Sequence, residues 1–231
     1  MRPLPLVLLA LGACAAPPAA PSGFRSIFDG RTLEGWSAPD MSYFSVRDGA
    51  ITGETTRDRN PPRNQFIVWT GGTVSDFDLR FKFRLVGPKA NSGMQFRGTV
   101  KEHGLVHGYQ ADIAREGPYL GGIWDEYGPR KSLAARGERV EISEDGKKTV
   151  VRFADAAALA DGIDLAQWTD YRIVAQGPRI RLWLNGRLVS ELVDRERGKA
   201  ASEGVLAMPI IPGEPMTVQY KDILLGPPPA E

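Results

Sequence analysis

Hydrophobic and polar residues alternate with a period of two along much of the chain. The clearest case is residues 77–85, where every odd position is apolar and every even position is charged. This pattern is typical of a strand that buries one face and exposes the other, as strands of antiparallel sheets do. The sequence therefore predicts a half-buried strand over these residues.

Turn signals divide the rest of the chain into further short strands. Gly177-Pro178 separates residues 171–176 from 180–184, and Asn185-Gly186 is a strong hairpin signal because both residues tolerate a positive φ. The remaining predicted strands are residues 46–53, 65–70, 92–97, 108–114, 148–153, 187–193, 205–208 and 218–224. Only residues 155–160 indicate a helix, and a short one.

Many short strands with almost no helix predict an all-β fold, a two-sheet antiparallel β-sandwich or jelly roll. The 231 residues include 42% hydrophobic residues, enough for a core, and 26 glycines and 18 prolines, which favour turns. No linker interrupts the chain, so we expect one domain over residues 24–226 and a C-terminal tail over 227–231. A curved sheet of such a sandwich would offer a hollow face to a ligand.

Charge and rare residue types exclude several classes of function. The 29 basic and 28 acidic residues lack the basic excess of a nucleic-acid-binding protein. One cysteine and two histidines cannot assemble a Cys/His zinc site, and no dense Asp/Asn loop indicates calcium. We therefore expect no nucleic-acid partner, no metal and no cofactor. Acid–base chemistry would have to use carboxylates.

The first residues have the features of an export signal. Arg2 gives a positive start, residues 4–11 are almost wholly apolar, and Leu-Gly-Ala precedes Cys14. The apolar run falls short of the roughly 20 residues that span a bilayer as a helix. Small residues before a cysteine resemble the lipobox of bacterial lipoproteins, in which the signal is cut before the cysteine and the cysteine is lipidated.

We accordingly predict a lipoprotein signal peptide over residues 1–13, a lipid anchor at Cys14 and a proline-containing tether over 14–23. An ordinary secretory signal cleaved within residues 15–20 is the alternative. In either case the protein is exported. We expect it in the bacterial cell envelope, as a membrane-anchored lipoprotein or in the periplasm, with the lipid anchor as its only membrane contact.

Polar and aromatic residues gather in three segments near the middle of the chain. If residues 91–97, 108–113 and 121–128 pair as strands, several of their side chains share one face. The candidate residues are Gln95, Arg97, Tyr109, Gln110, Asp112, Trp124, Asp125, Glu126 and Tyr127. Amides, carboxylates and a guanidinium suit sugar hydroxyls, and an aromatic ring stacks on a pyranose. A merely solvated strand face is the plainer explanation.

The tryptophans and the adjacent acids differ in what the pattern predicts for them. Trp69, Trp168 and Trp183 lie among apolar strand residues and are predicted to be core, so Trp124 is the aromatic expected in a groove. Asp125 and Glu126 would point to opposite faces of a strand, so both enter one site only if a bulge intervenes.

Residues 28–36, FDGRTLEGW, resemble the opening FDGKTLDGW of the 3-keto-disaccharide hydrolase domain family. Seven later segments agree in order: residues 46–51, 76–79, 91–97, 108–113, 124–126, 183–186 and 221–223. The resemblance covers residues 24–225 and implies a concanavalin A-like lectin/glucanase jelly roll acting on carbohydrate. The family commonly has Leu-Gln-Leu-His before its last strand, whereas residues 206–209 of this chain are Leu-Ala-Met-Pro.

Two chemical routes fit this resemblance. In a 3-keto sugar the C2 proton lies beside a carbonyl, so a base can remove it while an acid assists departure of the C1 oxygen, and water then adds. Direct hydrolysis by two carboxylates is the other route. Both assign Asp112 and Glu126 as acid/base residues, with Asp125 in reserve, and Arg97 as the group that polarises the keto oxygen.

Two other classes of function remain open. A non-catalytic, lectin-like lipoprotein would need the aromatic residues but not the carboxylates. A structural or partner-binding lipoprotein would bind no sugar. If the protein is either the enzyme or the lectin, we expect five residues to hold the carbohydrate: Gln95, Tyr109, Gln110, Trp124 and Tyr127.

Overall fold

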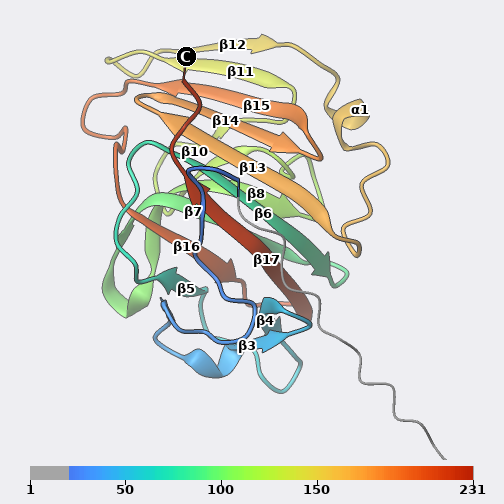
Figure 1. Cartoon of the computed structure of the whole chain (residues 1–231). Helices are drawn as coiled ribbons and strands as arrows, with labels where there is room; N and C mark the ends of the chain where they lie inside the picture. The colour runs from blue at the N-terminus through green and yellow to red at the C-terminus, as the bar shows by residue number, and fades with distance from the viewer. Residues whose placement is uncertain (1–20, 231) are drawn as a thin grey trace, which may run out of the picture.

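The computed structural model describes residues 21–230 as two β-sheets packed against each other (Figure 1). The predicted signal peptide, Cys14 and most of the predicted tether lie outside the described residues. Sheet A has the strand order β12-β11-β15-β14-β13-β6-β17-β4-β3, with the short β1 paired to β17, and sheet B has the order β10-β9-β8-β7-β16-β5-β2.

The strands of sheet A come from both ends and the second half of the chain. They are β1 (Arg25–Ser26), β3 (Phe44–Arg47), β4 (Ala50–Thr55), β6 (Phe77–Val86), β11 (Glu138–Ile142), β12 (Lys148–Arg152), β13 (Thr169–Gln176), β14 (Arg179–Leu184), β15 (Arg187–Asp194) and β17 (Met216–Gly226). Those of sheet B are β2 (Trp36–Ser37), β5 (Gln65–Trp69), β7 (Asn91–Val100), β8 (Val106–Ala114), β9 (Ile123–Glu126), β10 (Lys131–Ala134) and β16 (Val205–Ile210).

The predicted all-β two-sheet fold is confirmed. Named strand pairs are antiparallel except β11 with β15, which run parallel and so depart from the purely antiparallel prediction. The one α-helix of residues 21–230 is α1 (Ala156–Ala160), where the short helix was predicted, and Asp155 caps its first turn by accepting from the Ala158 amide. Two 3₁₀ turns, η1 (Met41–Tyr43) and η2 (Glu102–Gly104), complete the elements. No helix within residues 21–230 has the length and apolarity to cross a membrane.

One predicted strand is two. Residues 46–53 were expected to be continuous, but Asp48 and Gly49 adopt positive φ values of 53° and 70° and turn the chain, so β3 and β4 form a hairpin. The Asp48-Gly49 pair at the turn is the sequence signal for this change of direction.

The core lies between the sheets and is built by the alternation that the sequence shows. On β6 the side chains of Phe77, Leu79, Phe81, Phe83 and Leu85 are all 2% exposed or less and belong to one apolar cluster. The charged residues between them point to the outer face of sheet A. Alternation therefore sets the face of every side chain on this strand.

The prediction that all three tryptophans are core residues is wrong for two of them. Trp69 is 6% exposed and packs in the core. Trp168 and Trp183 are only half-buried, and each has cationic side chains over its ring: Lys221 lies 4.2 Å from the Trp168 centroid and Arg172 lies 4.9 Å from the Trp183 centroid. The outer face of sheet A thus carries aromatic rings among its charges.

Candidate functional site

Sheet B curls strongly, so its outer surface is concave. Three strands separate β9 from β5 in the sheet order, which at about 4.8 Å per strand step would place them roughly 19 Å apart in a flat sheet. Yet Asn64, next to β5, donates from Nδ2 to Glu126 Oε1 on β9 at 3.4 Å, and the rings of Phe66 and Tyr127 lie 6.3 Å apart. We call this surface of sheet B the concave face.

The floor of the concave face holds a chain of polar side chains from two neighbouring strands. Gln95 Nε2 on β7 donates to Gln110 Oε1 on β8 at 3.4 Å, and Gln110 Nε2 donates to Asp112 Oδ1 at 2.7 Å. All three are under a tenth exposed, and Gln95 Oε1 has no hydrogen-bond partner among residues 21–230. A buried, unpartnered carbonyl oxygen is costly unless a water or ligand hydroxyl donates to it.

The two carboxylates of the concave face have raised pKa values. Burial, together with the negative charge of Glu126, raises the pKa of Asp112 to about 7, and the Gln110 hydrogen bond only partly opposes this. Burial also raises the pKa of Glu126, with Lys131 acting in the opposite direction. Near neutral pH one carboxyl can therefore hold a proton while the other releases one, which is what acid–base chemistry requires.

An aromatic wall rises beside Glu126. Tyr127 stands at a positive φ of 58°, is 40% exposed and stacks on His107, with their ring centroids 4.9 Å apart. Near the other end, Trp124 is half-buried and meets the Tyr119 ring edge-on at 5.8 Å. The concave face therefore has aromatic rings from β9 and the turn after it beside its polar floor.

Sequence reasoning missed Asn64 and His107. Each lies one residue before a predicted strand, outside the alternating pattern. Long-range curling of the sheet brings Asn64 to Glu126, so no local signal could have indicated that contact. Among the predicted site residues, only Tyr127 indicated an aromatic surface beside Glu126.

The prediction that Arg97 shares a face with Gln95 is wrong. Arg97 has a φ of 49° at a shift of register between β7 and β8, and this bulge turns its side chain away from the concave face. Its guanidinium donates to the carbonyl oxygens of Ser75 and Gly177 and to Asp76 Oδ1. Arg97 thus ties loops together and does not reach a ligand on the concave face.

Tyr109 is likewise a core residue and not a sugar-contacting one. It is 2% exposed, its ring stacks on Phe96 with centroids 5.6 Å apart, and its hydroxyl donates to Asp194 on sheet A. The alternation on β8 that points Gln110 outward necessarily points Tyr109 inward.

Asp125 also points away from the concave face, as a strand without a bulge requires. Its Oδ2 accepts from Arg130 Nε at 3.1 Å, and Arg130 Nη1 reaches Asp194 at 2.7 Å. The Arg130 backbone amide donates to the same Asp125 oxygen at 3.3 Å, and a Cβ on Gly128 would lie 2.0 Å from it. The turn is therefore wound tightly around the Asp125 carboxylate. Asp125 shapes the loop that carries Tyr127 and is not an acid of the site.

The departure from the Leu-Gln-Leu-His pattern falls on the concave face. Leu206, Met208 and Ile210 of β16 point into the core, so Ala207 and Pro209 occupy the alternate, concave positions. Pro209 stands where the pattern has histidine, so β16 contributes no acid–base group to this face. Residues 21–230 contain no group of three or more His, Cys, Asp or Glu placed to hold a metal ion.

Several solved structures with a similar fold have names that refer to carbohydrate binding or cleavage. A carbohydrate-binding module, CBM66 from Bacillus subtilis, superposes with a TM-score of 0.51 at 15% identity, covering 83% of this chain and 95% of its own. A protein assigned to the glycosyl hydrolases of Parabacteroides distasonis gives 0.55 at 16% identity, over 89% and 94%. An endo-β-galactosidase from Clostridium perfringens that releases GlcNAcα1-4Gal gives 0.54 at 11% identity, over 91% and 64%.

The two-sheet architecture is a jelly roll like that of the carbohydrate-binding module and of a galectin-like protein from Bacillus subtilis. The chain belongs to the 3-keto-alpha-glucoside-1,2-lyase-like domain family, which it matches over residues 23–225. No curated protein matches the chain as a relative.

Proposed function

We propose that the protein cleaves the glycosidic bond of 3-keto-disaccharides or 3-keto-glycosides on its concave face. The observation that carries this proposal is the pair of carboxyls with raised pKa values, Asp112 and Glu126, on a hollow face whose floor includes the unpartnered oxygen of Gln95. Family membership supports the class of substrate.

The proposed mechanism is elimination followed by hydration. A base removes the C2 proton, which the neighbouring C3 carbonyl acidifies, and the electron pair forms the C1–C2 double bond as the C1–oxygen bond breaks. The departing oxygen takes a proton from an acid. Addition of water across the double bond then restores the 3-keto sugar, so the net result is hydrolysis.

The two carboxyls differ in the way this mechanism needs. Asp112 is the more deeply buried and its pKa is raised to about 7, so it holds a proton near neutral pH and serves as the acid. Glu126 is only half-buried, with Asn64 donating to it, and it serves as the base. Gln95 and Gln110 bind hydroxyls, and Trp124 and Tyr127 contact the sugar rings.

Purified protein should release product from 3-keto-glucosides and not from the unmodified glycosides, because only the former have an acidified C2 proton. Solvent deuterium should enter C2 of the product, which direct hydrolysis would not cause. Asp112→Asn should reduce turnover without loss of fold. Unchanged turnover in Asp112→Asn, or equal cleavage of both sets of glycosides, would contradict the proposal.

A lectin-like role is the second candidate, and the similarity to a carbohydrate-binding module favours it. This role predicts saturable glycan binding that survives Asp112→Asn and fails in Trp124→Ala, with no turnover of either set of glycosides.

We also propose that the protein is an exported lipoprotein of the cell envelope, anchored at Cys14. Metabolic labelling with a palmitate analogue should mark the wild type and leave Cys14→Ser unlabelled. A labelled Cys14→Ser variant would contradict the anchor.

A further inference from the structure

A trough crosses the outer face of sheet A, on the side of the molecule opposite the concave face. One hollow of about 380 Å³ lies over β17, β6, β13 and β14, and a second of about 770 Å³ lies beside it under the N-terminal segment. The two hollows share Lys82, Asp222 and Leu224, so they are continuous. Each volume is within the ~300–1,000 Å³ of ordinary ligand sites.

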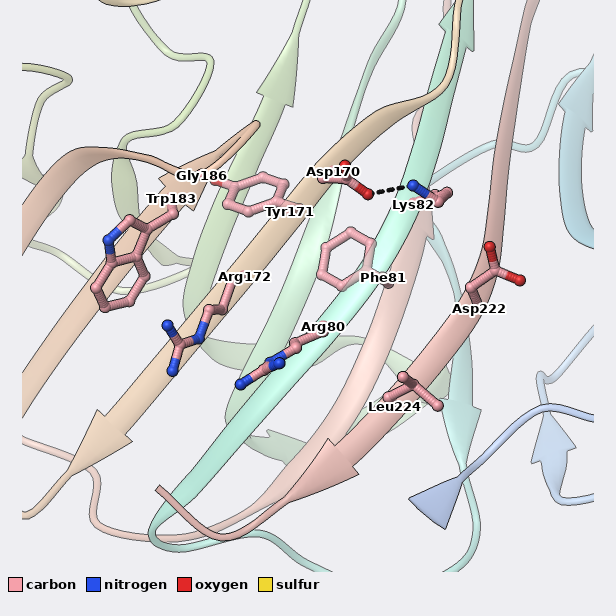
Figure 2. A pocket seen from close by; sticks show the side chains of 10 residues that line it. All are labelled: Arg80, Phe81, Lys82, Asp170, Tyr171, Arg172, Trp183, Gly186, Asp222 and Leu224. Carbon is pink, nitrogen blue, oxygen red and sulfur yellow. Dashed lines mark hydrogen bonds and ion pairs between the residues drawn. The ribbon is translucent and has the colours of Figure 1, made fainter. Parts of the chain in front are cut away.

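Figure 2 shows how the first hollow is lined. The Trp183 indole lies at one side, Leu224 and Asp222 lie at the other, and charged side chains from β6 and β13 fill the floor between them. Trp183 is half-buried, and Arg172 lies against its ring. The hollow thus combines apolar surfaces at its edges with donors and acceptors between them.

The cations of the hollow are already neutralised by carboxylates. Arg172 and Arg80 both bind Asp78, through Nη2–Oδ2 contacts of 2.6 Å and 2.9 Å, and Lys82 is paired with Asp170 (Figure 2). Arg80 and Arg172 share one carboxylate, and Asp222 supplies the third negative charge beside the three cations. An anionic ligand would therefore find no net positive charge in the first hollow.

The same pairs leave hydrogen-bonding groups free. Nη1 of Arg80 and of Arg172 makes no hydrogen bond within residues 21–230, because only Nε and Nη2 of each bind Asp78. The two guanidiniums lie side by side on paired positions of β13 and β6, and the carboxylates of Asp170 and Asp222 lie farther along the same hollow. Sugar hydroxyls, which both donate and accept, can use both kinds of group.

Asp222 is placed in the trough by a distorted backbone. Its φ is 53°, and the pairing of β17 with β6 shifts register between Lys221 and Leu224. A positive φ at a non-glycine residue is uncommon and costs free energy, so a position that keeps it deserves a functional explanation. Here the bulge turns the Asp222 carboxylate into both hollows.

Several sequence segments that resemble the family line this trough and have no part in the concave face. Phe28, Asp29 and Gly30 line the second hollow, and Trp183 and Gly186 line the first. The cleavage proposed above uses none of these residues.

We propose that the trough is a second carbohydrate-binding site, one that holds a neutral oligosaccharide on sheet A independently of the cleavage site. Trp183 stacks on a sugar ring, the free Arg80 and Arg172 groups donate to hydroxyls, and Asp222 accepts from them. The ligand class follows from the paired charges of the trough; the proposal goes beyond cleavage and does not require it.

The test measures binding of uncharged malto-, xylo- and laminari-tetraoses to the full-length chain in detergent by calorimetry. Trp183→Ala and Asp222→Ala should each raise the Kd of the tetraose that binds by about fivefold or more, the weight of one aromatic or hydrogen-bonding contact. Trp168→Ala is the matched control, since Trp168 is also half-buried on sheet A but lies outside the trough. It should leave the Kd unchanged.

Two further measurements distinguish carbohydrate binding in the trough from the proposed cleavage and from anion binding. Asp112→Asn should bind the tetraose normally, so failure of the proposed cleavage would leave trough binding intact. Inorganic phosphate should not compete with the tetraose. Absence of binding to all three tetraoses, equal binding by Trp183→Ala, Asp222→Ala and wild type, or displacement by phosphate would each overturn the proposal.

Discussion

Two buried aspartates on opposite sheets, Asp112 and Asp78, have opposite charge environments. Asp78 lies on the outer face of sheet A. Burial alone would raise its pKa, but hydrogen bonds from Arg172 and Arg80 outweigh burial and lower the pKa below its usual value. Asp112 lies on the concave face of sheet B, where an amide is its partner and burial raises its pKa to about 7.

The difference shows that the neighbours of a carboxylate, more than its depth, decide what it can do. Arginine holds Asp78 permanently charged, and Asp78 in return fixes two guanidiniums that line the trough. No cation is within ion-pair distance of Asp112 among residues 21–230, so its proton is exchangeable near neutral pH. The outer face of sheet A is therefore suited to binding and the concave face to proton transfer.

The largest expected effect is on turnover, and it should differ between two glutamates, one on each face. Glu126→Gln should reduce turnover of a 3-keto-glucoside by about 10²–10⁴-fold, because an amide cannot accept the C2 proton. Glu191→Gln is the matched control: Glu191 lies on sheet A, paired with Arg139 and Arg179, and its variant should retain turnover. Single-turnover rates measure both. Equal losses in the two variants would remove the functional distinction between the faces.

The second effect is a dependence of stability on pH. Asp112 titrates near 3.8 in the unfolded chain and near 7 in the folded protein, so folding takes up a proton between these pH values. The contribution of Asp112 to the free energy of unfolding is therefore fully present below about pH 4 and is lost as pH rises toward 7. At 1.36 kcal/mol per pKa unit the loss is roughly 4 kcal/mol at most.

Asp112→Asn cannot titrate and should lack this contribution to the pH dependence. Urea unfolding of wild type and variant from pH 4 to pH 8 measures the difference, which should turn in favour of the variant as pH rises. A constant difference across this range would show that Asp112 has an ordinary pKa in the folded protein.

How far the sequence predicts these faces depends on the regularity of the strands. On β6, and on β13 from Thr169 to Ile173, the alternation is unbroken, so the outward direction of Asp78 and Arg172 follows directly from it. On β7 one residue at a positive φ reverses the outcome: Gln95 points as predicted, while Arg97 does not. A bulge has no signature in residue type alone when its residue is arginine.

The contacts across the concave face are harder to predict from the local sequence pattern. Glu126 and Asp112 were predicted as acid/base candidates from alternation and resemblance, and both point to the concave face. The approach of Asn64 to Glu126 depends on the curl of a whole sheet, which is a collective property of several bulges and twisted strands. Pattern arguments assign a side chain to a face but do not give the curvature of that face.

The third effect is a contribution to stability that depends on pH in the opposite direction from that of Asp112. Asp78→Asn should lower the free energy of unfolding at pH 7 by about 2–3 kcal/mol, because Arg172 and Arg80 lose a charged acceptor. The pKa of Asp78 is lowered in the folded protein, so its contribution is present above pH 3.8 and fades as pH falls through the folded pKa. Turnover should not change. Urea unfolding at pH 7 gives the result, and a variant as stable as wild type would mean the ion pairs add nothing.

The smallest expected effect tests the amide chain beneath Asp112. Gln110 donates to Asp112 and so lowers its pKa against the effect of burial. Gln110→Met keeps the bulk of the side chain and removes this hydrogen bond, worth about 1 kcal/mol, so the pKa of Asp112 should rise further. Because the proposed mechanism uses Asp112 as the acid, the fall of turnover on the alkaline side of the pH profile should move to higher pH. Gln219→Met, which removes an amide from the outer face of sheet A where Gln219 donates to Thr52, should leave the profile in place. If the rise of turnover on the acidic side moved to higher pH instead, Asp112 would be a group that must be deprotonated, and the roles of the two carboxyls would be exchanged.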